Sequence, residues 1–371
     1  MIEKGKISAF QMGAMIYPSI LATGIVTVPS ITATYAKQDL WISPIWNCPI
    51  GLLMVFVVLQ LHKLYPGENI IQYSERIMGR FGGKTLGIFF LFFFLHNNSL
   101  ILREYAEFII TTGLFKTPII VVIAGMVLVC AFAVRGGVEV LARAALVFLP
   151  LFTIPLLMVS LMLLPDMEPR NILPIMGNGF IPSLKGAFFI VAWFGDLLYL
   201  SFLLPFLTDR EKVGKWGTIS VMAIILTMVV TNLASVLVLG GVTQQELYPV
   251  MNIVRYISLA DFFEHVEAII MAVWIAGVFV KFSFFYYALV LGTAQWLDLS
   301  DYKSIVLPFG FLQVICSIWV TPNLQYMGHY FSTTGAFYVP LIEIMIPLFL
   351  LFAALIRKKY KEKSPKSSNV R

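Results

Sequence analysis

The chain has 371 residues, of which 59% are hydrophobic and 12% are charged, and its mean hydropathy is +0.87. Because a soluble globular domain has about 25% charged residues, this composition excludes an ordinary soluble protein and indicates a polytopic membrane protein. The formal net charge of +6 is expected to reflect membrane topology and a basic C-terminal tail near anionic lipid headgroups, and it gives no support to a nucleic-acid partner.

Windows of about 20 apolar residues predict ten transmembrane helices in the lipid bilayer. They lie near 10–34, 43–63, 86–113, 118–134, 141–164, 184–207, 217–240, 262–296, 304–320 and 337–356. We expect an all-α integral membrane fold that forms a single transmembrane domain over 1–371. Within it, residues 7–165 and 183–357 are expected to form two five-helix halves, followed by a basic tail over 358–371. Lysine and arginine gather in one alternate set of loops, so the positive-inside rule predicts that both termini are cytoplasmic.

The first segment is expected to be a broken helix, interrupted at Thr23-Gly24-Ile25-Val26-Thr27-Val28-Pro29. Such a break persists at membrane depth only where it lines a protein-enclosed cavity, because hydrocarbon cannot satisfy the freed backbone groups. The second half-helix would offer free N–H groups and a positive dipole end to a carboxylate. The predicted ligand residues here are Thr23, Gly24, Ile25, Val26 and Thr27. Alternatively, Gly24 is a close-packing residue in a continuous helix.

The third segment carries two sets of polar residues. Asn97 and Asn98 lie deep in it, where a buried amide needs partners, so one of them is predicted to contact the ligand; the alternative is a hydrogen bond between helices. Nearer the outer end, Arg103 and Glu107 stand four residues apart and are expected to pair on one face, with Glu104 beside them. Structural pairing is favoured there over contact with a ligand.

The outer loop 166–182 is too rich in proline and glycine for a helix and is expected to link the two halves. In the sixth segment the predicted interruption is Trp193-Phe194-Gly195-Asp196. Broken helices at corresponding positions of two halves indicate an inverted-repeat transporter fold with a site at the bilayer midplane. Freed carbonyls at 192–195 would accept from an ammonium group, with Trp193 and Phe194 as walls and Asp196 either holding the ammonium or pairing with backbone or a neighbouring helix.

The second half adds two further candidates. The outer stretch 243–261 is either an amphipathic lid in the interface or a plain surface loop. Lys281 lies near the centre of the eighth segment, where it cannot easily reach the headgroups. Two interpretations fit it: it takes the place of a coupling cation between the first and eighth segments, or it pairs with Glu343 or Asp196.

No cofactor or metal site is predicted. Cys48, Cys130 and Cys316 lie in apolar segments without ligand spacing, and the four histidines are scattered. A nucleophile with a neighbouring base is also missing from the sequence motifs, so we do not expect an enzyme.

Several of these patterns together carry a resemblance to a known family. They are the motif at 23–29, the loop Asn171-x-Leu173-Pro174-x-x-Gly177-x-Gly179-x-x-Pro182, Arg103-x-x-Ala106-Glu107, and Glu267 with Val273-Trp274-Ile275. Over essentially its whole length the chain resembles the B subunit of bacterial spore germinant receptors. That family is similar to the amino acid–polyamine–organocation transporters, which implies two inverted five-helix repeats with broken helices 1 and 6.

The resemblance also implies a function. It suggests a nutrient-sensing subunit in the spore inner membrane that binds a small molecule, expected to be an amino acid, whose carboxylate would lie at Gly24. The partners implied are a larger membrane A subunit and a lipoprotein C subunit. The alternative is a proton-coupled amino acid transporter of the same fold, for which Asp196 and Lys281 would be the coupling groups.

Overall fold

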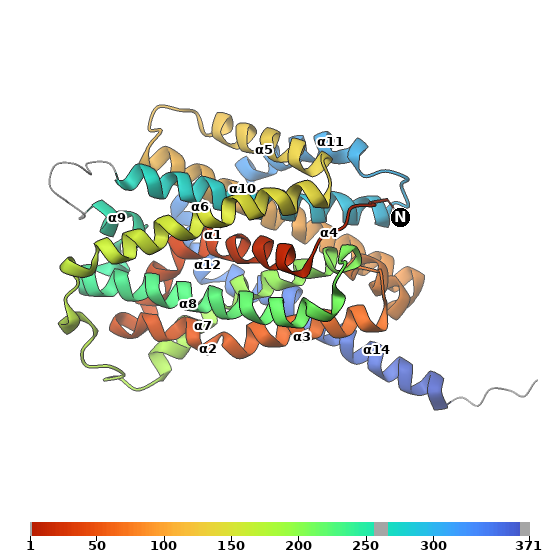
Figure 1. Ribbon diagram of the computed structural model, residues 1–371, viewed down its shortest axis with the longest axis horizontal. Coiled ribbons are helices and arrows are strands. Elements are labelled where there is room, and N and C mark those ends of the chain that lie inside the picture. The colour runs from red at the N-terminus through yellow and green to blue at the C-terminus, as the bar shows by residue number, and fades with distance from the viewer. Residues whose placement is uncertain (1, 256–265, 364–371) are drawn as a thin grey trace, which may run out of the picture.

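The computed structural model describes residues 2–255 and 266–363, which form one bundle of helices (Figure 1). Within these ranges the regular structure is helical, and the one pairing of extended backbone is an isolated parallel bridge between Ile7 and Leu207. The expected all-α fold is confirmed.

The α-helices are α1 (Ala9–Ala36), α2 (Ser43–Trp46), α3 (Cys48–Leu64), α4 (Ile70–Thr112), α5 (Ile119–Arg135), α6 (Val138–Met162), α7 (Ile181–Gly195), α8 (Val213–Leu239), α9 (Pro249–Arg255), α10 (Val266–Trp296), α11 (Lys303–Trp319), α12 (Leu324–Ser332), α13 (Thr334–Pro340) and α14 (Ile346–Lys363). The 3₁₀ turns are η1 (Lys37–Ile42), η2 (Leu164–Asp166), η3 (Pro169–Ile172), η4 (Asp196–Phe202), η5 (Leu204–Phe206), η6 (Arg210–Lys212) and η7 (Gly240–Gln245). One π-helical turn, η8, covers Leu341–Met345.

Each of the ten predicted segments coincides with a helical stretch, but the count of ten membrane spans is not confirmed. By length and composition, seven helical runs in the described ranges could cross a membrane, or eight if α11 and α12, bent by 90° at their junction, form one span. The first of these runs, Ala9–Leu64, contains both α1 and α3. The start of the eighth predicted segment, 262–265, and the end of the predicted outer stretch, 256–261, lie outside the described residues, as does 364–371 of the tail.

The predicted interruption of the first segment is wrong, because α1 is one continuous helix through Thr23 and Pro29. Thr27 donates its hydroxyl to the Thr23 carbonyl at 2.9 Å, the back-bonding typical of a hydroxyl inside a helix. A Cβ on Gly24 would lie 2.7 Å from the Met228 methyl and 3.5 Å from the Trp193 ring. Gly24 therefore serves the close approach of three helices.

The interruption of the sixth segment is confirmed as a change of helix type. The α-helix α7 ends at Gly195, and the chain continues as the 3₁₀ turns η4 and η5. Runs of 3₁₀ structure this long are uncommon and mark strained or functional places in a helix. Pro205 lies in η5 and cannot donate a backbone hydrogen bond, so it favours the end of the regular helix here.

The helices α1 and α10 form the middle of the bundle. In Figure 1, α1 lies between α10 on one side and α7 and α8 on the other, and its packing partners are α6, α7, α8 and α10. The helix α10 packs in turn on α4, α5 and α6. A helix surrounded in this way is apolar on every face, which is why most residues of α1 are buried.

The N-terminal segment ties several elements together at one end of the bundle. Its Ile7 backbone accepts from Thr208 at 3.0 Å and donates to Phe206 at 3.0 Å. The Glu3 carboxylate accepts from the Tyr302 hydroxyl at 3.0 Å and from the Val138 amide at 3.2 Å. The last described turns of α14 lie at the same end (Figure 1), so the first and last described residues lie on one side of the bundle.

Candidate functional site

A small cavity of about 50 Å³ lies among seven elements in the middle of the bundle. It is lined by Thr23 of α1, by Asn97, Leu100, Ile101 and Glu104 of α4, by Phe189, Ala192 and Trp193 of α7, by Asp196 of η4, by Lys281 of α10, and by Phe331, Gly335, Ala336 and Val339 of α12 and α13. A water molecule needs roughly 10 to 15 Å³ of such space. The cavity therefore suits a ligand of few heavy atoms.

The polar centre of this cavity is a buried ion pair between Lys281 and Asp196. The Lys281 ammonium donates to the Asp196 carboxylate at 2.8 Å and to the Thr23 hydroxyl at 3.0 Å. The Thr23 hydroxyl also accepts from the Trp193 indole at 2.9 Å. Lys281 and Asp196 are only 2% and 8% exposed, and such a pair is tolerated in an apolar interior only when its hydrogen bonds are this complete.

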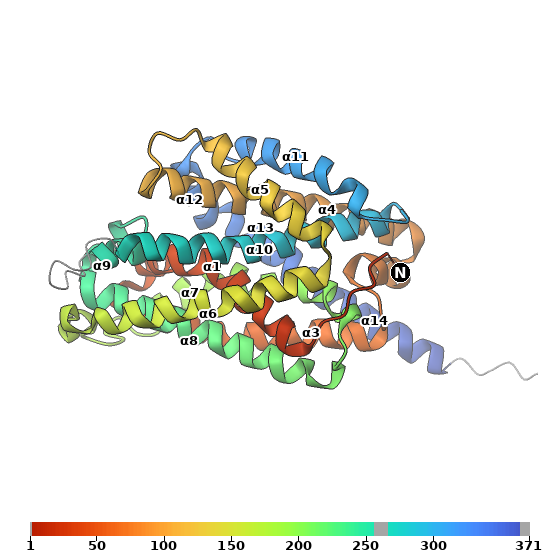
Figure 2. The same ribbon diagram turned by 45° about the horizontal axis from the view of Figure 1, so that its top comes forward.

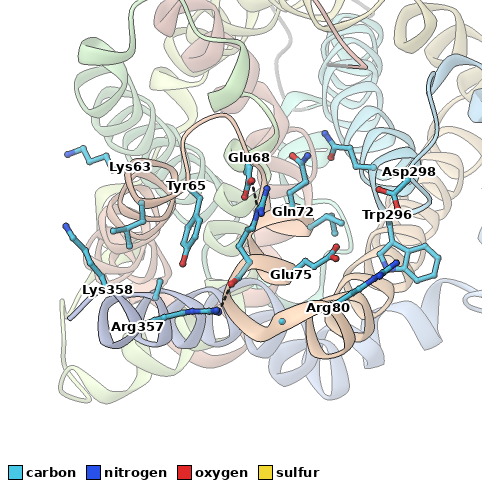
Figure 3. Close-up of a pocket in the computed structure, with 17 residues that line it drawn as sticks. Lys63, Tyr65, Glu68, Gln72, Glu75, Arg80, Trp296, Asp298, Arg357 and Lys358 are labelled. Atoms are coloured by element: carbon cyan, nitrogen blue, oxygen red, sulfur yellow. Dashed lines mark hydrogen bonds and ion pairs between the residues drawn. The ribbon is translucent and has the colours of Figure 1, made fainter. Parts of the chain in front are cut away.

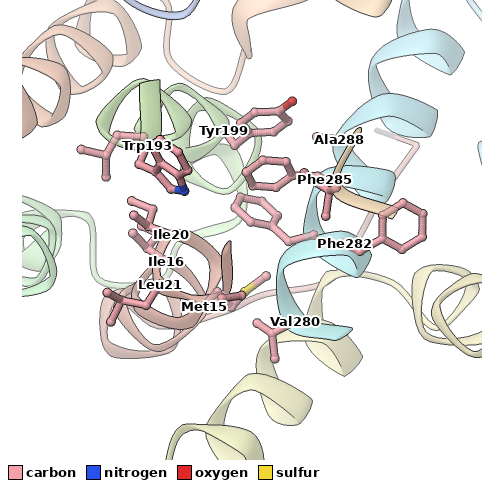
Figure 4. Packing of buried hydrophobic residues seen from close by; sticks show 14 of the residues in the cluster. Met15, Ile16, Ile20, Leu21, Trp193, Tyr199, Val280, Phe282, Phe285 and Ala288 are labelled. Carbon is pink, nitrogen blue, oxygen red and sulfur yellow. The ribbon is translucent and has the colours of Figure 1, made fainter. Parts of the chain in front are cut away.

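The expected pairing of Lys281 with a buried carboxylate is confirmed, and the partner is Asp196. The hydrogen bond to Thr23 links α10 to α1, and the interpretation that Lys281 takes the place of a coupling cation stays a prediction. The charge of Lys281 also lies over the Phe285 ring, 5.2 Å from the centroid. Figure 4 shows the buried hydrophobic core beside the site, which includes Trp193, Tyr199 and Phe285. Tyr199 and Phe285 stack there with centroids 3.7 Å apart.

A second buried carboxyl, Glu343, lies beside Asp196 on the π-helical turn η8. It is 0% exposed, and among the described residues neither of its carboxyl oxygens has a hydrogen-bond partner. Gly195 makes the approach possible, because a Cβ there would lie 2.5 Å from a Glu343 carboxyl oxygen. Asp196 and Glu343 thus both lie on non-α turns, which are frequent at functional sites.

The structure brings together five of the residues predicted from sequence. Thr23, Asn97, Trp193, Asp196 and Lys281 all line the cavity. The remaining predicted ligand residues do not line it: Gly24, Ile25, Val26, Thr27, Asn98, Phe194 and Gly195.

The residues outside the cavity have structural contacts instead. Asn98 donates to the Gln313 amide oxygen at 2.9 Å, which is the interhelical hydrogen bond weighed as its alternative. Phe194, Ile25 and Val26 are buried in the apolar core. Because α1 is continuous, the N–H groups at 24–27 are used within the helix. They do not form the predicted carboxylate subsite.

The expected pair in α4 is confirmed. Arg103 contacts Glu107 at 2.7 Å, and it donates further to the Pro322 carbonyl at 3.1 Å. This arrangement fastens α4 to the turn that follows α11.

Sequence reasoning missed the face of α4 that lines the cavity. Asn97, Leu100, Ile101 and Glu104 follow the spacing i, i+3, i+4, i+7, which places four side chains on one helical face. This periodicity was the available signal. Glu104 was grouped with Arg103 because the two are adjacent in sequence, yet adjacent residues on a helix point in different directions.

A second, larger cavity has a volume of about 1020 Å³ and is shown in Figure 3. It is lined by residues of α3, α4, α10 and α14, with charges of both signs that include Lys63, Glu75 and Arg80. Arg357 donates to the Arg76 and Ile77 carbonyls at 2.6 and 2.8 Å.

Those carbonyls end the first part of α4. Gly79 interrupts the helix with a φ of 79°, a left-handed conformation that glycine adopts readily. Arg357 therefore acts as a side-chain cap at this kink.

The described residues contain no group of three or more histidine, cysteine, aspartate or glutamate side chains placed to hold a metal ion. The three cysteines, each within the described ranges, are free thiols.

Comparison with known proteins identifies a family and several relatives of this chain. A family model described as "Spore germination protein" matches residues 6–325. The chain is 28% identical to spore germination protein KB of Bacillus subtilis over 369 residues, covering 98% of each protein. It is 25% identical to spore germination protein YndE of the same organism, covering 95% of this chain and 98% of that protein.

Two solved transporter structures share the fold. A Na⁺-coupled sialic acid symporter in a substrate-bound, outward-open state matches 93% of this chain and 79% of its own, with a TM-score of 0.61 and 14% identity. A nucleobase–cation–symport-1 family transporter in a closed conformation matches 91% of this chain and 78% of its own, with a TM-score of 0.58 and 10% identity. The fold is therefore that of the LeuT-like transporters.

Proposed function

The chain belongs to the family of spore germination proteins, and from this premise we propose that it is the nutrient-binding subunit of a germinant receptor. It is a multi-pass membrane protein in which a small molecule, in our proposal an amino acid, binds at the cavity between α1, α4, α7 and α10. Binding would shift the helices that partner subunits contact. We propose no catalytic step.

One observation carries the proposal: the cavity that the Lys281–Asp196 pair lines in a transporter fold. Ionisable residues deep in a membrane protein are expensive and mark ligand or ion sites. Binding sites of this fold class lie near the bilayer midplane, where helices change their regular geometry. Here the change from α7 to η4 occurs at Asp196 itself.

The setting of the subunit is part of the proposal. We place it in the spore inner membrane with both termini cytoplasmic. The orientation is supported because lysine and arginine gather on that side and because the first and last described residues lie at one end of the bundle. Its partners would be a larger membrane A subunit and a lipoprotein C subunit.

A proton-coupled amino acid transporter is the second candidate. The fold favours it, because the two solved structures described above are transporters. The buried carboxyls Asp196 and Glu343 beside Lys281 would then carry the proton. Fold alone is a weak guide to activity, so this candidate needs the uptake experiment described at the end of the Discussion.

A thermal-shift screen tests whether the cavity binds a nutrient. Purified protein is heated with single amino acids, D-glucose or inosine, and a ligand at a hundred times its Kd stabilises the folded state by about 2.7 kcal/mol. Ala192→Trp fills the cavity wall and is expected to abolish the shift. Ala124→Trp on the exposed face of α5 is the matched control and keeps it. An equal shift in the Ala192→Trp protein would place the ligand elsewhere.

A further inference from the structure

Glu104 is a buried acid that takes part in no ion pair among the described residues. It is 3% exposed, it lines the central cavity, and its Oε1 has no hydrogen-bond partner among the described residues. A buried carboxyl oxygen without a partner bears a large desolvation cost. An unsatisfied group of this kind that faces a cavity points to a partner from outside the protein.

The basic side chains nearest to Glu104 are already engaged. Arg103, its neighbour in sequence, lies on another face of α4 and contacts Glu107 at 2.7 Å. Lys281, on α10, is within electrostatic reach of Glu104, but its ammonium donates to Asp196 at 2.8 Å and to Thr23 at 3.0 Å.

A neutral donor does not replace the missing cation. The Thr27 hydroxyl of α1 lies beside Glu104, but its proton goes to the Thr23 carbonyl at 2.9 Å. The acidic neighbour of Glu104 is Asp196 on η4, and Asp196 in turn lies beside Glu343 on η8. Among the residues that line the cavity, two carboxyls therefore share one ammonium group.

We infer that Glu104 is the residue that recognises the protonated amine of the nutrient. The inference rests on the proposed function and names the chemistry of the same site. A ligand ammonium would supply the positive charge and the N–H donors that the Glu104 carboxylate lacks. Charge-assisted hydrogen bonds of this kind are short and strong.

Lys281 would bind the other end of the ligand. Its ammonium has three N–H donors, of which two are used. The third can donate to a ligand carboxylate, which replaces the backbone subsite expected at Gly24. Leu100, Ile101 and Ala336 also line the cavity and supply apolar surface for the side chain of the ligand. A small neutral amino acid, with an amine and a carboxylate on one carbon, satisfies both.

The experiment compares amino acids with their amine-free analogues. Purified wild-type protein is titrated by calorimetry with L-alanine and L-valine, and with propionate and 3-methylbutanoate. We expect at least about tenfold tighter binding of the amino acids, as a charged hydrogen bond gives. Glu104→Gln is expected to lose this preference, and Glu104→Asp to keep part of it.

Glu107→Gln is the matched control, because Glu107 is buried one turn away on α4 and does not line the cavity. It is expected to lower the melting temperature by unpairing Arg103 and to leave the amine preference intact. Glutamine also mimics a protonated Glu104, so an undiminished preference in Glu104→Gln would show that the carboxyl has only a structural role and would overturn the inference.

Other ligands separate this inference from the proposed function. If wild-type protein binds D-glucose or inosine but no amine, the proposed nutrient-binding function stands and the role of Glu104 is overturned. The same conclusion follows if wild-type protein binds the amino acids and their amine-free analogues equally. Failure of every amino acid, sugar and nucleoside to bind would overturn both.

Discussion

At the scale of single residues, the Lys281–Asp196 pair matters more for the proposed ligand site than for the stability of the fold. Two charges held 2.8 Å apart at this depth contribute little net stability, because desolvation offsets their attraction. In our proposal, their value lies in a lysine that lines the cavity and keeps one N–H donor for a ligand. Removing one partner alone should therefore cost far more than removing both.

We predict that Lys281→Met destabilises the protein by about 3 to 5 kcal/mol, because it leaves the Asp196 carboxylate buried without its cation. The double variant Lys281→Met with Asp196→Asn should recover most of that loss. Thermal unfolding in detergent of the wild type, both single variants and the double variant gives the coupling energy. Additive effects of the two substitutions would contradict the pairing.

The sequence alone could identify the charged residues of the site but not their pairing. Lys281 and Asp196 stand out because ionisable residues are rare in apolar segments. Whether Lys281 meets Asp196 or Glu343 depends on how α7, α10 and η8 pack, and these elements are distant in the chain. The role of Glu104 was hidden by its neighbour Arg103, although the periodic face that begins at Asn97 was readable.

At the scale of elements, the difference between the first and sixth segments shows what a glycine in a membrane helix leaves open. Both segments combine glycine with a later proline, and that pattern is typical of broken and of close-packed helices alike. In α1 the helix is continuous, and Gly24 allows Met228 of α8 and Trp193 of α7 to pack closely against it. In α7 the helix does change type at Asp196, as the sequence indicated.

We predict that Gly24→Leu destabilises the protein by about 1 to 3 kcal/mol through overpacking against Met228. The second-site change Met228→Ala should restore much of the melting temperature and any ligand binding that was lost, because it removes the methyl group that lies 2.7 Å from the new Cβ. If Gly24 instead held a ligand carboxylate, Met228→Ala would give no rescue of binding.

The kink of α4 offers a second test at this scale. Arg357→Ala removes the side chain that donates to the Arg76 and Ile77 carbonyls beside Gly79. The loss is worth about 1 kcal/mol locally, so hydrogen exchange in a peptide covering 70–83 should speed up roughly fivefold. Lys359→Ala, which changes an exposed side chain two residues further along α14, is the control and should leave exchange unchanged. Unaltered exchange in Arg357→Ala would show that the cap is not stabilising.

At the scale of the whole molecule, the N-terminal segment holds several helices together at one end of the bundle. Glu3 accepts hydrogen bonds from Tyr302 and from the start of α6, and Ile7 joins the end of η5. Burial, and next the nearby Glu3 charge, raise the pKa of Tyr302, so its hydroxyl remains a donor in this network. A ligand that shifts α1 or α7 would have to strain these hydrogen bonds. In our proposal, the partner subunits respond to that shift.

Whether the molecule signals or transports is decided by what the binding energy does. A ligand drives a conformational change only through its different affinity for two states. In a receptor that free energy moves an equilibrium that partner subunits read, and the ligand need not cross the membrane.

We therefore predict that the isolated chain in proteoliposomes binds its nutrient but shows no concentrative uptake of labelled amino acid, with or without a proton gradient. In spores, deletion of either proposed partner subunit should abolish the germination response while this chain still binds the nutrient. Robust gradient-driven uptake by the chain alone, together with a response that survives loss of both partners, would make it a transporter, because the same buried charges would then be coupling transport to protons.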